Sequence, residues 1–136
     1  MSKNKFKPAR EWFNQADYDL KTADAMFRTG RYIYTVFMCH LSIEKVLKGL
    51  YAQKFNETPP KIHNLLYFIE KIKLKPSEDL YDFIFSLNRV SIPTRYPDDL
   101  HRMLSDYNQK STKILLRKSK EVLKWSRIKL KEQSNS

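Results

Sequence analysis

Residues 31–55 read RYIYTVFMCHLSIEKVLKGLYAQKF, and this stretch decides the fold class. One face of a 3.6-residue period carries a long apolar stripe: Tyr32, Val36, Cys39, Ile43, Val46 and Leu50. The first half of the stretch also has a second apolar face: Tyr34, Phe37, Met38 and Leu41. A helix that is apolar on all sides is buried on more than one side. We therefore predict a long helix that is central to a bundle or that also faces another subunit.

The rest of the chain shows the same helical periodicity, interrupted by clear breaks. A helix over 9–28 is predicted to stop near Gly30. A loop with Pro59 and Pro60 precedes a short helix at about 63–73. Pro76 separates this helix from a second one at about 77–89, for which Ser77 is a candidate cap. A last helix is predicted to begin after Asp98 and to run to about Leu130. No segment alternates like a half-buried strand, so the class is all-α.

The length of 136 residues predicts one domain with enough chain to bury a core. We divide the chain into a basic extension (1–8), one helical bundle (9–131) and a frayed tail (132–136). The longest apolar run, residues 32–41, is about half of the ~20 residues that a membrane span needs. The polar N-terminus does not resemble a signal peptide, and the single Cys39 has no partner for an internal disulfide. A cytoplasmic location is the natural expectation.

The net charge of +11 comes from 26 Lys and Arg against 15 acids. A basic surface attracts polyanions, so RNA, DNA and an acidic protein partner all fit; a generally lysine-rich proteome is the plain alternative. The last helix is the most basic part, with eight basic residues and one acid between 113 and 131. A solvated lysine-rich face is the simpler interpretation, and a surface that docks phosphates is the sharper one. Its apolar residues form two stripes: Ile114, Val122, Trp125 and Ile128 on one face, and Leu116, Leu123 and Leu130 on the other.

The segment 91–101, SIPTRYPDDLH, is the strongest candidate for chemistry. Its two prolines favour extended backbone before them, so Arg95 is expected on a stiff non-helical link. Asp98 is placed to cap the next helix, and His101 would then fall in its first turn. A guanidinium can hold a phosphate through its planar fork, and an imidazole can take or give a proton near neutral pH. The plainer alternative is that Arg95 pairs with a nearby aspartate while His101 only packs.

Other polar residues have simple structural explanations. His40 lies among apolar residues and is expected to be a satisfied buried or interface side chain, whereas His63 is expected to fix the start of a helix. Glu44 and Lys48 have the spacing of a surface pair on a helix. The histidines and Cys39 lack zinc-site spacing, and we find no glycine-rich phosphate loop, so no metal or cofactor is expected.

Four motifs in the right order nevertheless resemble the HEPN family (higher eukaryotes and prokaryotes nucleotide-binding domain). The first lies in the first predicted helix and comprises Trp12, Ala16, Asp19, Leu20 and Ala23. The second is the run from Tyr34 to Lys48, with its Glu44-Lys45 and Leu47-Lys48 pairs. The third is KIHNL at 61–65, and the fourth is RYPD at 95–98. The resemblance covers about residues 9 to 130.

The resemblance implies an up-and-down antiparallel bundle of four to five helices that forms two-fold dimers. Active HEPN members carry Arg, four to six residues and then His, and they cleave RNA without a metal ion at the dimer cleft. Arg95 and His101 match this spacing. By this resemblance His101 would move protons and Arg95 would stabilise charge on the phosphorane. Tyr96, Asp98, Glu44 and Lys48 would support the site, with Glu44 near the cleft.

The resemblance also implies a partner, because many members are toxins encoded beside a minimal nucleotidyltransferase antitoxin. In some of them the partner adenylylates a tyrosine two residues after the histidine; Met103 occupies that position here. The alternative function is therefore a non-catalytic nucleotide- or substrate-binding module that partners such a nucleotidyltransferase.

Overall fold

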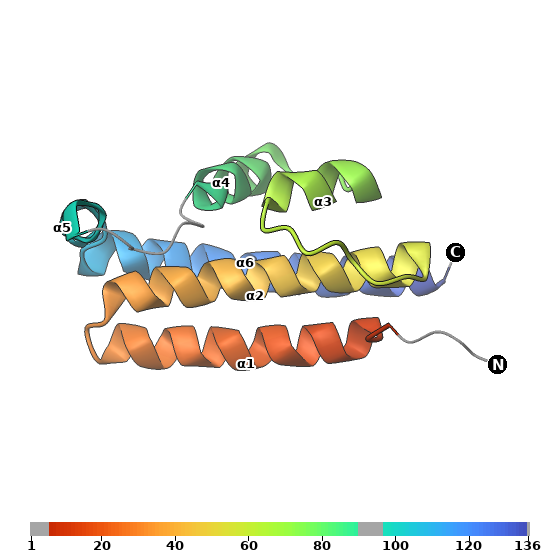
Figure 1. Cartoon of the computed structure of the whole chain (residues 1–136), viewed down its shortest axis with the longest axis horizontal. Helices are drawn as coiled ribbons and strands as arrows, with labels where there is room; N and C mark the ends of the chain where they lie inside the picture. The colour runs from red at the N-terminus through yellow and green to blue at the C-terminus, as the bar shows by residue number, and fades with distance from the viewer. Residues whose placement is uncertain (1–5, 90–96, 136) are drawn as a thin grey trace.

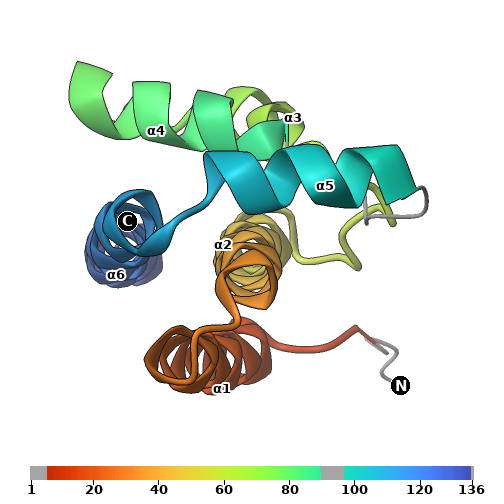
Figure 2. The same cartoon turned by 90° about the vertical axis from the view of Figure 1, so that its left-hand side faces the viewer.

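The computed structural model describes residues 6–89 and 97–135, and these residues form six helices and no strand. The helices are α1 (Ala9–Arg28), α2 (Tyr32–Phe55), α3 (Leu65–Ile72), α4 (Glu78–Asn88), α5 (Pro97–Asp106) and α6 (Gln109–Ser134). The long helices α1, α2 and α6 lie side by side, α3 packs on another side of α2, and α4 packs against α3 and α6 (Figure 1). The short α5 lies across one end of the bundle, roughly perpendicular to the long helices (Figure 2). The all-α prediction is confirmed.

The central position predicted for residues 31–55 is also confirmed. Helix α2 packs against α1, α3, α5 and α6, and most of its side chains are buried. Its second apolar face is covered less completely, because Tyr34 keeps 56% of its surface exposed and Phe37 is only half-buried. The chain by itself therefore leaves part of this face in contact with solvent.

The turn between α1 and α2 and the contact between them both depend on glycine. Gly30 has a φ of 78°, which a residue with a Cβ adopts only with strain. On α2, a Cβ at Gly49 would lie 2.9 Å from two ring atoms of Phe13. The two helices can therefore approach closely at this point.

After α2, the helices α3 and α4 bring the chain back toward the end of the bundle where α2 starts. Helix α6 then runs in the same direction as α2 (Figure 1).

The last predicted helix is in fact two helices, which is why the structure has six rather than four or five. Helix α5 ends at Asp106, and Asn108 accepts a hydrogen bond from the Ser111 amide (2.9 Å) to start α6. Helix α6 also continues beyond the predicted end to Ser134. The Gln133 amide donates to the Leu50 carbonyl at 3.2 Å, which ties this last turn to α2.

Burial does not divide the two stripes of the last helix cleanly. Leu116 and Leu123 of one stripe and Val122 of the other are buried, whereas Ile114 and Ile128 remain 42% and 51% exposed. On α1, Asp19 is buried and pairs with Lys45 at 2.7 Å. No helix in the described part of the chain is both long and apolar enough to cross a bilayer.

Candidate functional site

The segment proposed for catalysis is described only from residue 97 onward, so Arg95 and Tyr96 lie outside the described residues. Helix α5 begins at Pro97, which suits the first helical position because proline has no N–H to leave unpaired there. Asp98 is consequently inside the first turn and not at the capping position that we predicted. His101 follows one turn later instead of lying in the first turn.

Helix α5 has an exposed face and a buried face. The His101 side chain is exposed, while Met103, two residues later, is only 8% exposed. Leu104 keeps 59% of its surface exposed, so an apolar side chain and an imidazole both face solvent on this short helix. Helix α5 packs against α2 and lies across one end of the bundle (Figure 2), so these residues belong to that end.

A second polar site is centred on Glu44, in the middle of α2. The Lys48 Nζ lies 2.9 Å from Glu44 Oε2, and the His63 Nδ1 lies 3.1 Å from both carboxylate oxygens. The His40 Nδ1 is 3.8 Å from Glu44 Oε1. We call these four residues the Glu44 cluster. It joins three positions of α2 to the segment that precedes α3.

The Glu44–Lys48 pair is buried, which corrects the prediction of a surface pair. Glu44 is 4% exposed and Lys48 is 8% exposed. A carboxylate and an ammonium are retained in a protein interior only when they satisfy each other, because removing either charge from water is costly. The His63 side chain, in contrast, is 73% exposed and lies between the buried pair and the solvent.

His40 is the least satisfied member of the Glu44 cluster. Burial lowers the pKa of its imidazole, and nearby His63 lowers it further, while the Glu44 carboxylate acts in the opposite direction. The Nε2 of His40 is buried and has no hydrogen-bond partner within the described residues. The prediction that His40 is buried is confirmed, but the prediction that it is satisfied is wrong, because neither ring nitrogen has a hydrogen-bond partner among the described residues.

Two aromatic rings neighbour this cluster: Trp12 on α1, and Phe68 on α3, whose ring centre lies 5.9 Å from the Lys48 Nζ. The Lys7 Nζ lies 4.2 Å from the centre of the Trp12 ring, and the Lys48 Nζ lies 6.0 Å from it. A cation over an indole face is stabilised by the ring quadrupole. Trp12 therefore contributes to the electrostatics around Lys48 as well as to packing.

The Glu44 cluster can hold one imidazole in a fixed orientation. A neutral His63 that donates Nδ1–H to the buried carboxylate would present Nε2 as an acceptor or base. The sequence indicated the Glu44–Lys48 pair through its i,i+4 spacing but did not connect His63 to it. No sequence signal brings His63 onto Glu44 from 19 residues away.

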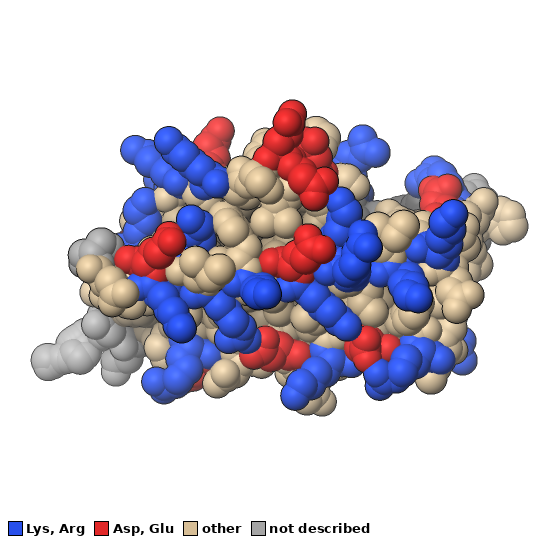
Figure 3. Space-filling model, turned by 180° about the vertical axis from the view of Figure 1, so that it is seen from behind, with Lys and Arg blue, Asp and Glu red and all other residues tan. Residues whose placement is uncertain are grey.

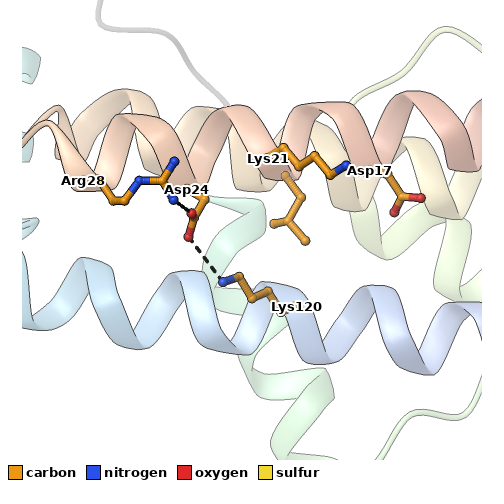
Figure 4. A pocket seen from close by; sticks show the side chains of 6 residues that line it. Asp17, Lys21, Asp24, Arg28 and Lys120 are labelled. Carbon is orange, nitrogen blue, oxygen red and sulfur yellow. Dashed lines mark hydrogen bonds and ion pairs between the residues drawn. The ribbon is translucent and has the colours of Figure 1, made fainter.

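Away from both sites, a pocket lies between α1 and α6 (Figure 4). Asp24 accepts from Arg28 on its own helix and from Lys120 on α6, the latter at 3.3 Å. His101 does not line this pocket. Within residues 6–89 and 97–135, no group of three or more His, Cys, Asp or Glu side chains is arranged to hold a metal ion.

Comparison with known proteins gives a consistent result for sequence and structure. The HEPN domain matches residues 9–129. The crystal structure of TT1696 from Thermus thermophilus is similar with a TM-score of 0.75 and 25% identity, over 89% of this chain and 97% of that one. The crystal structure of ST0689, an archaeal HEPN homologue, has a TM-score of 0.71 and 21% identity, over 91% of this chain and 98% of that one. No curated protein matches the sequence.

Proposed function

The chain belongs to the HEPN domain family, and we propose that it is a metal-independent, toxin-like endoribonuclease whose active site is shared by two copies of the chain. Each copy contributes Arg95 and His101, so one chain carries half a site. The observation that carries the proposal is the exposed His101 on α5, six positions after Arg95 in a chain of this family.

The reaction follows from the chemistry of these two side chains. The 2′-hydroxyl of RNA attacks the adjacent phosphorus, the bond from phosphorus to the 5′-oxygen breaks, and a 2′,3′-cyclic phosphate remains. One His101 takes the proton from the 2′-hydroxyl, and its symmetry mate gives a proton to the leaving oxygen. The Arg95 guanidinium stabilises the extra negative charge of the phosphorane.

The remaining predicted site residues have supporting roles in this proposal. Tyr96 and Asp98 lie between the two catalytic positions along the chain and would orient the substrate phosphate and the start of α5. Glu44 and Lys48 form a buried ion pair on α2, and α2 is the helix against which α5 packs. A compensated pair at this depth would hold a constant electrostatic environment beside the site without binding substrate.

Exposed apolar side chains support a two-fold dimer. Tyr34 and Leu104 keep 56% and 59% of their surfaces exposed. They belong to α2 and α5, which contact each other in the monomer. A second copy placed on these helices would cover both side chains and bring two His101 residues near one axis.

The test is cleavage of single-stranded RNA by the purified protein in EDTA, with analysis of the product ends. We expect fragments with 2′,3′-cyclic phosphate, and loss of cleavage by at least about a hundredfold in Arg95→Ala and His101→Ala. Arg10→Ala is the control for a lost cation, because Arg10 is exposed in the first turn of α1 and belongs to neither candidate site. Intact RNA with folded, dimeric protein would refute the proposal, as would full activity in both alanine variants.

A second candidate is a non-catalytic module that binds a nucleotide or substrate beside a minimal nucleotidyltransferase. The observation that favours it is Met103, which is a buried thioether where some family members have a modifiable tyrosine. This candidate predicts a stable complex with a nucleotidyltransferase encoded nearby and no RNA cleavage by the isolated chain. A cleaving isolated chain would eliminate it.

A further inference from the structure

The exposed face of α6 carries a regular line of cations. Their positions advance by alternating steps of four and three residues, and all of them are exposed: Lys113, Arg117, Lys120, Lys124, Arg127 and Lys131. Steps of four and three keep side chains on one helix face. At 1.5 Å per residue the line is ~27 Å long. We call it the α6 basic stripe; Figure 3 shows the side of the molecule on which Lys and Arg outnumber Asp and Glu.

The first part of the stripe borders a groove between α1 and α6 of about 450 Å³. Its apolar lining comes from Phe27, Ile114 and Leu116. Its charged lining is basic except for one aspartate: Arg28, Lys113, Arg117, Lys120 and Asp24. An apolar floor inside a basic rim can hold a flat apolar group that carries a negative charge.

Acids from α1 neutralise part of the stripe but not all of it. Asp24 pairs with Lys120 and Asp17 pairs with Arg127, and both contacts bridge α1 to α6 (Figure 4 shows the first). Lys113 and Lys124 pair with no acid among the described residues. The stripe therefore retains positive charge along its length, in alternation with ion pairs that fix α6 on α1.

We propose that the α6 basic stripe and its groove bind single-stranded RNA, with the backbone along the stripe and a base in the apolar part of the groove. This deepens the proposed function and rests on it for the identity of the ligand. The groove lies where α1 ends and α6 begins, which is the end of the bundle that α5 covers (Figure 1). A strand held there is led toward His101.

An acidic amphipathic helix fits this surface less well than RNA. Such a helix needs apolar anchors spaced along its whole length. The apolar lining of the groove comes from Phe27, Ile114 and Leu116 at one end, and Leu20 is the single apolar residue among those that line the adjoining pocket between the same helices. Farther along, the Asp17–Arg127 ion pair lies between the helices. A phosphate backbone requires only regularly placed cations there, and one base is enough to use the apolar end.

The binding test uses a fluorescent 2′-O-methyl oligouridine, which cannot be cleaved because its 2′-oxygen is blocked. The variant is Lys113→Gln with Lys124→Gln, measured by anisotropy over a range of salt concentrations. We expect affinity to fall by about tenfold at low salt and the logarithmic salt slope to decrease in magnitude by about 1.4. The matched control is Lys71→Gln with Lys75→Gln, two exposed lysines off α6 with the same change in charge.

The outcomes separate this inference from the proposed function. Equal loss in both double variants, or competition by polyglutamate as strong as by unlabelled oligouridine, would show attraction by net charge alone and overturn the inference. Ile114→Ser should weaken binding of the oligouridine several-fold more than binding of a duplex of the same length. Equal weakening would refute the proposal that a base occupies the groove. Stripe-dependent binding without cleavage of ordinary RNA would refute the catalytic proposal alone.

Discussion

The Glu44 cluster and the α6 basic stripe are both rich in basic side chains, yet they use charge in opposite ways. In the cluster, Lys48 and two histidines surround one buried carboxylate. Along the stripe, the cations stand in solvent, and only some of them meet an acid from α1. Burial makes charge compensation obligatory, because an unpaired ion in the interior is costly. Exposure removes that requirement and leaves the cations available to a ligand.

The largest expected effect comes from breaking the buried pair. Glu44→Gln leaves the Lys48 ammonium buried without a carboxylate, so we expect the free energy of unfolding to fall by about 3 kcal/mol in urea titrations. Glu121→Gln is the control, since its partner Arg117 is 4.0 Å away and both side chains are mostly exposed. If both substitutions cost the same, the contrast between the two regions would be wrong.

A smaller effect concerns the pH dependence of the Glu44 cluster. Burial lowers the pKa of His40 in the folded state, so between the folded and unfolded pKa values the unfolded chain binds more protons. Stability is therefore full above the unfolded pKa near 6.5 and declines as the pH falls toward the folded pKa, at no more than about 1.4 kcal/mol per pH unit for one group.

The corresponding measurement compares urea midpoints at pH 7.5 and pH 5.5 for the native protein and for His40→Gln. The variant should lose less stability than the native protein when the pH is lowered. The same decline in both proteins would assign the pH dependence to other groups and would leave His40 without the role that its burial suggests.

The smallest expected effect on stability belongs to the stripe. Lys124→Gln changes an exposed side chain that meets no acid in the described structure, so the free energy of unfolding should change by less than about 0.5 kcal/mol. The same substitution, combined with Lys113→Gln, is the one expected to weaken RNA binding. A destabilisation above about 1 kcal/mol would mean that the stripe is a structural element and not a ligand surface.

Local signals explain why the first four helices could be placed so well from the sequence. Gly30 adopts a positive φ in the turn that follows α1. Ser77 caps α4, because its side chain accepts a hydrogen bond from the Leu80 amide at 3.2 Å. These signals act within a few residues and need no distant partner. The break between α5 and α6 was missed because Tyr107-Asn108 contains neither glycine nor proline, and asparagine also occurs inside helices.

The candidate site was predictable only in part. The spacing of Arg95 and His101 and the resemblance to the HEPN family came from the sequence, and the family is confirmed. The roles of Arg95, His101, Tyr96, Asp98, Glu44 and Lys48 in the site remain predictions. The buried state of Glu44 could not be inferred, because an i,i+4 pair of glutamate and lysine has the same pattern on a surface and in an interior.

The sequence alone determined the helical class, the central position of α2 and the family, since periodicity, caps and short motifs are local properties of the chain. The tertiary structure decided which polar residues meet. It placed His63 on Glu44, buried Asp19 against Lys45 and set the cations of α6 beside Asp17 and Asp24 of α1. The physical reason is that burial and charge compensation depend on what packs against a side chain, and residues far apart in the sequence supply those neighbours.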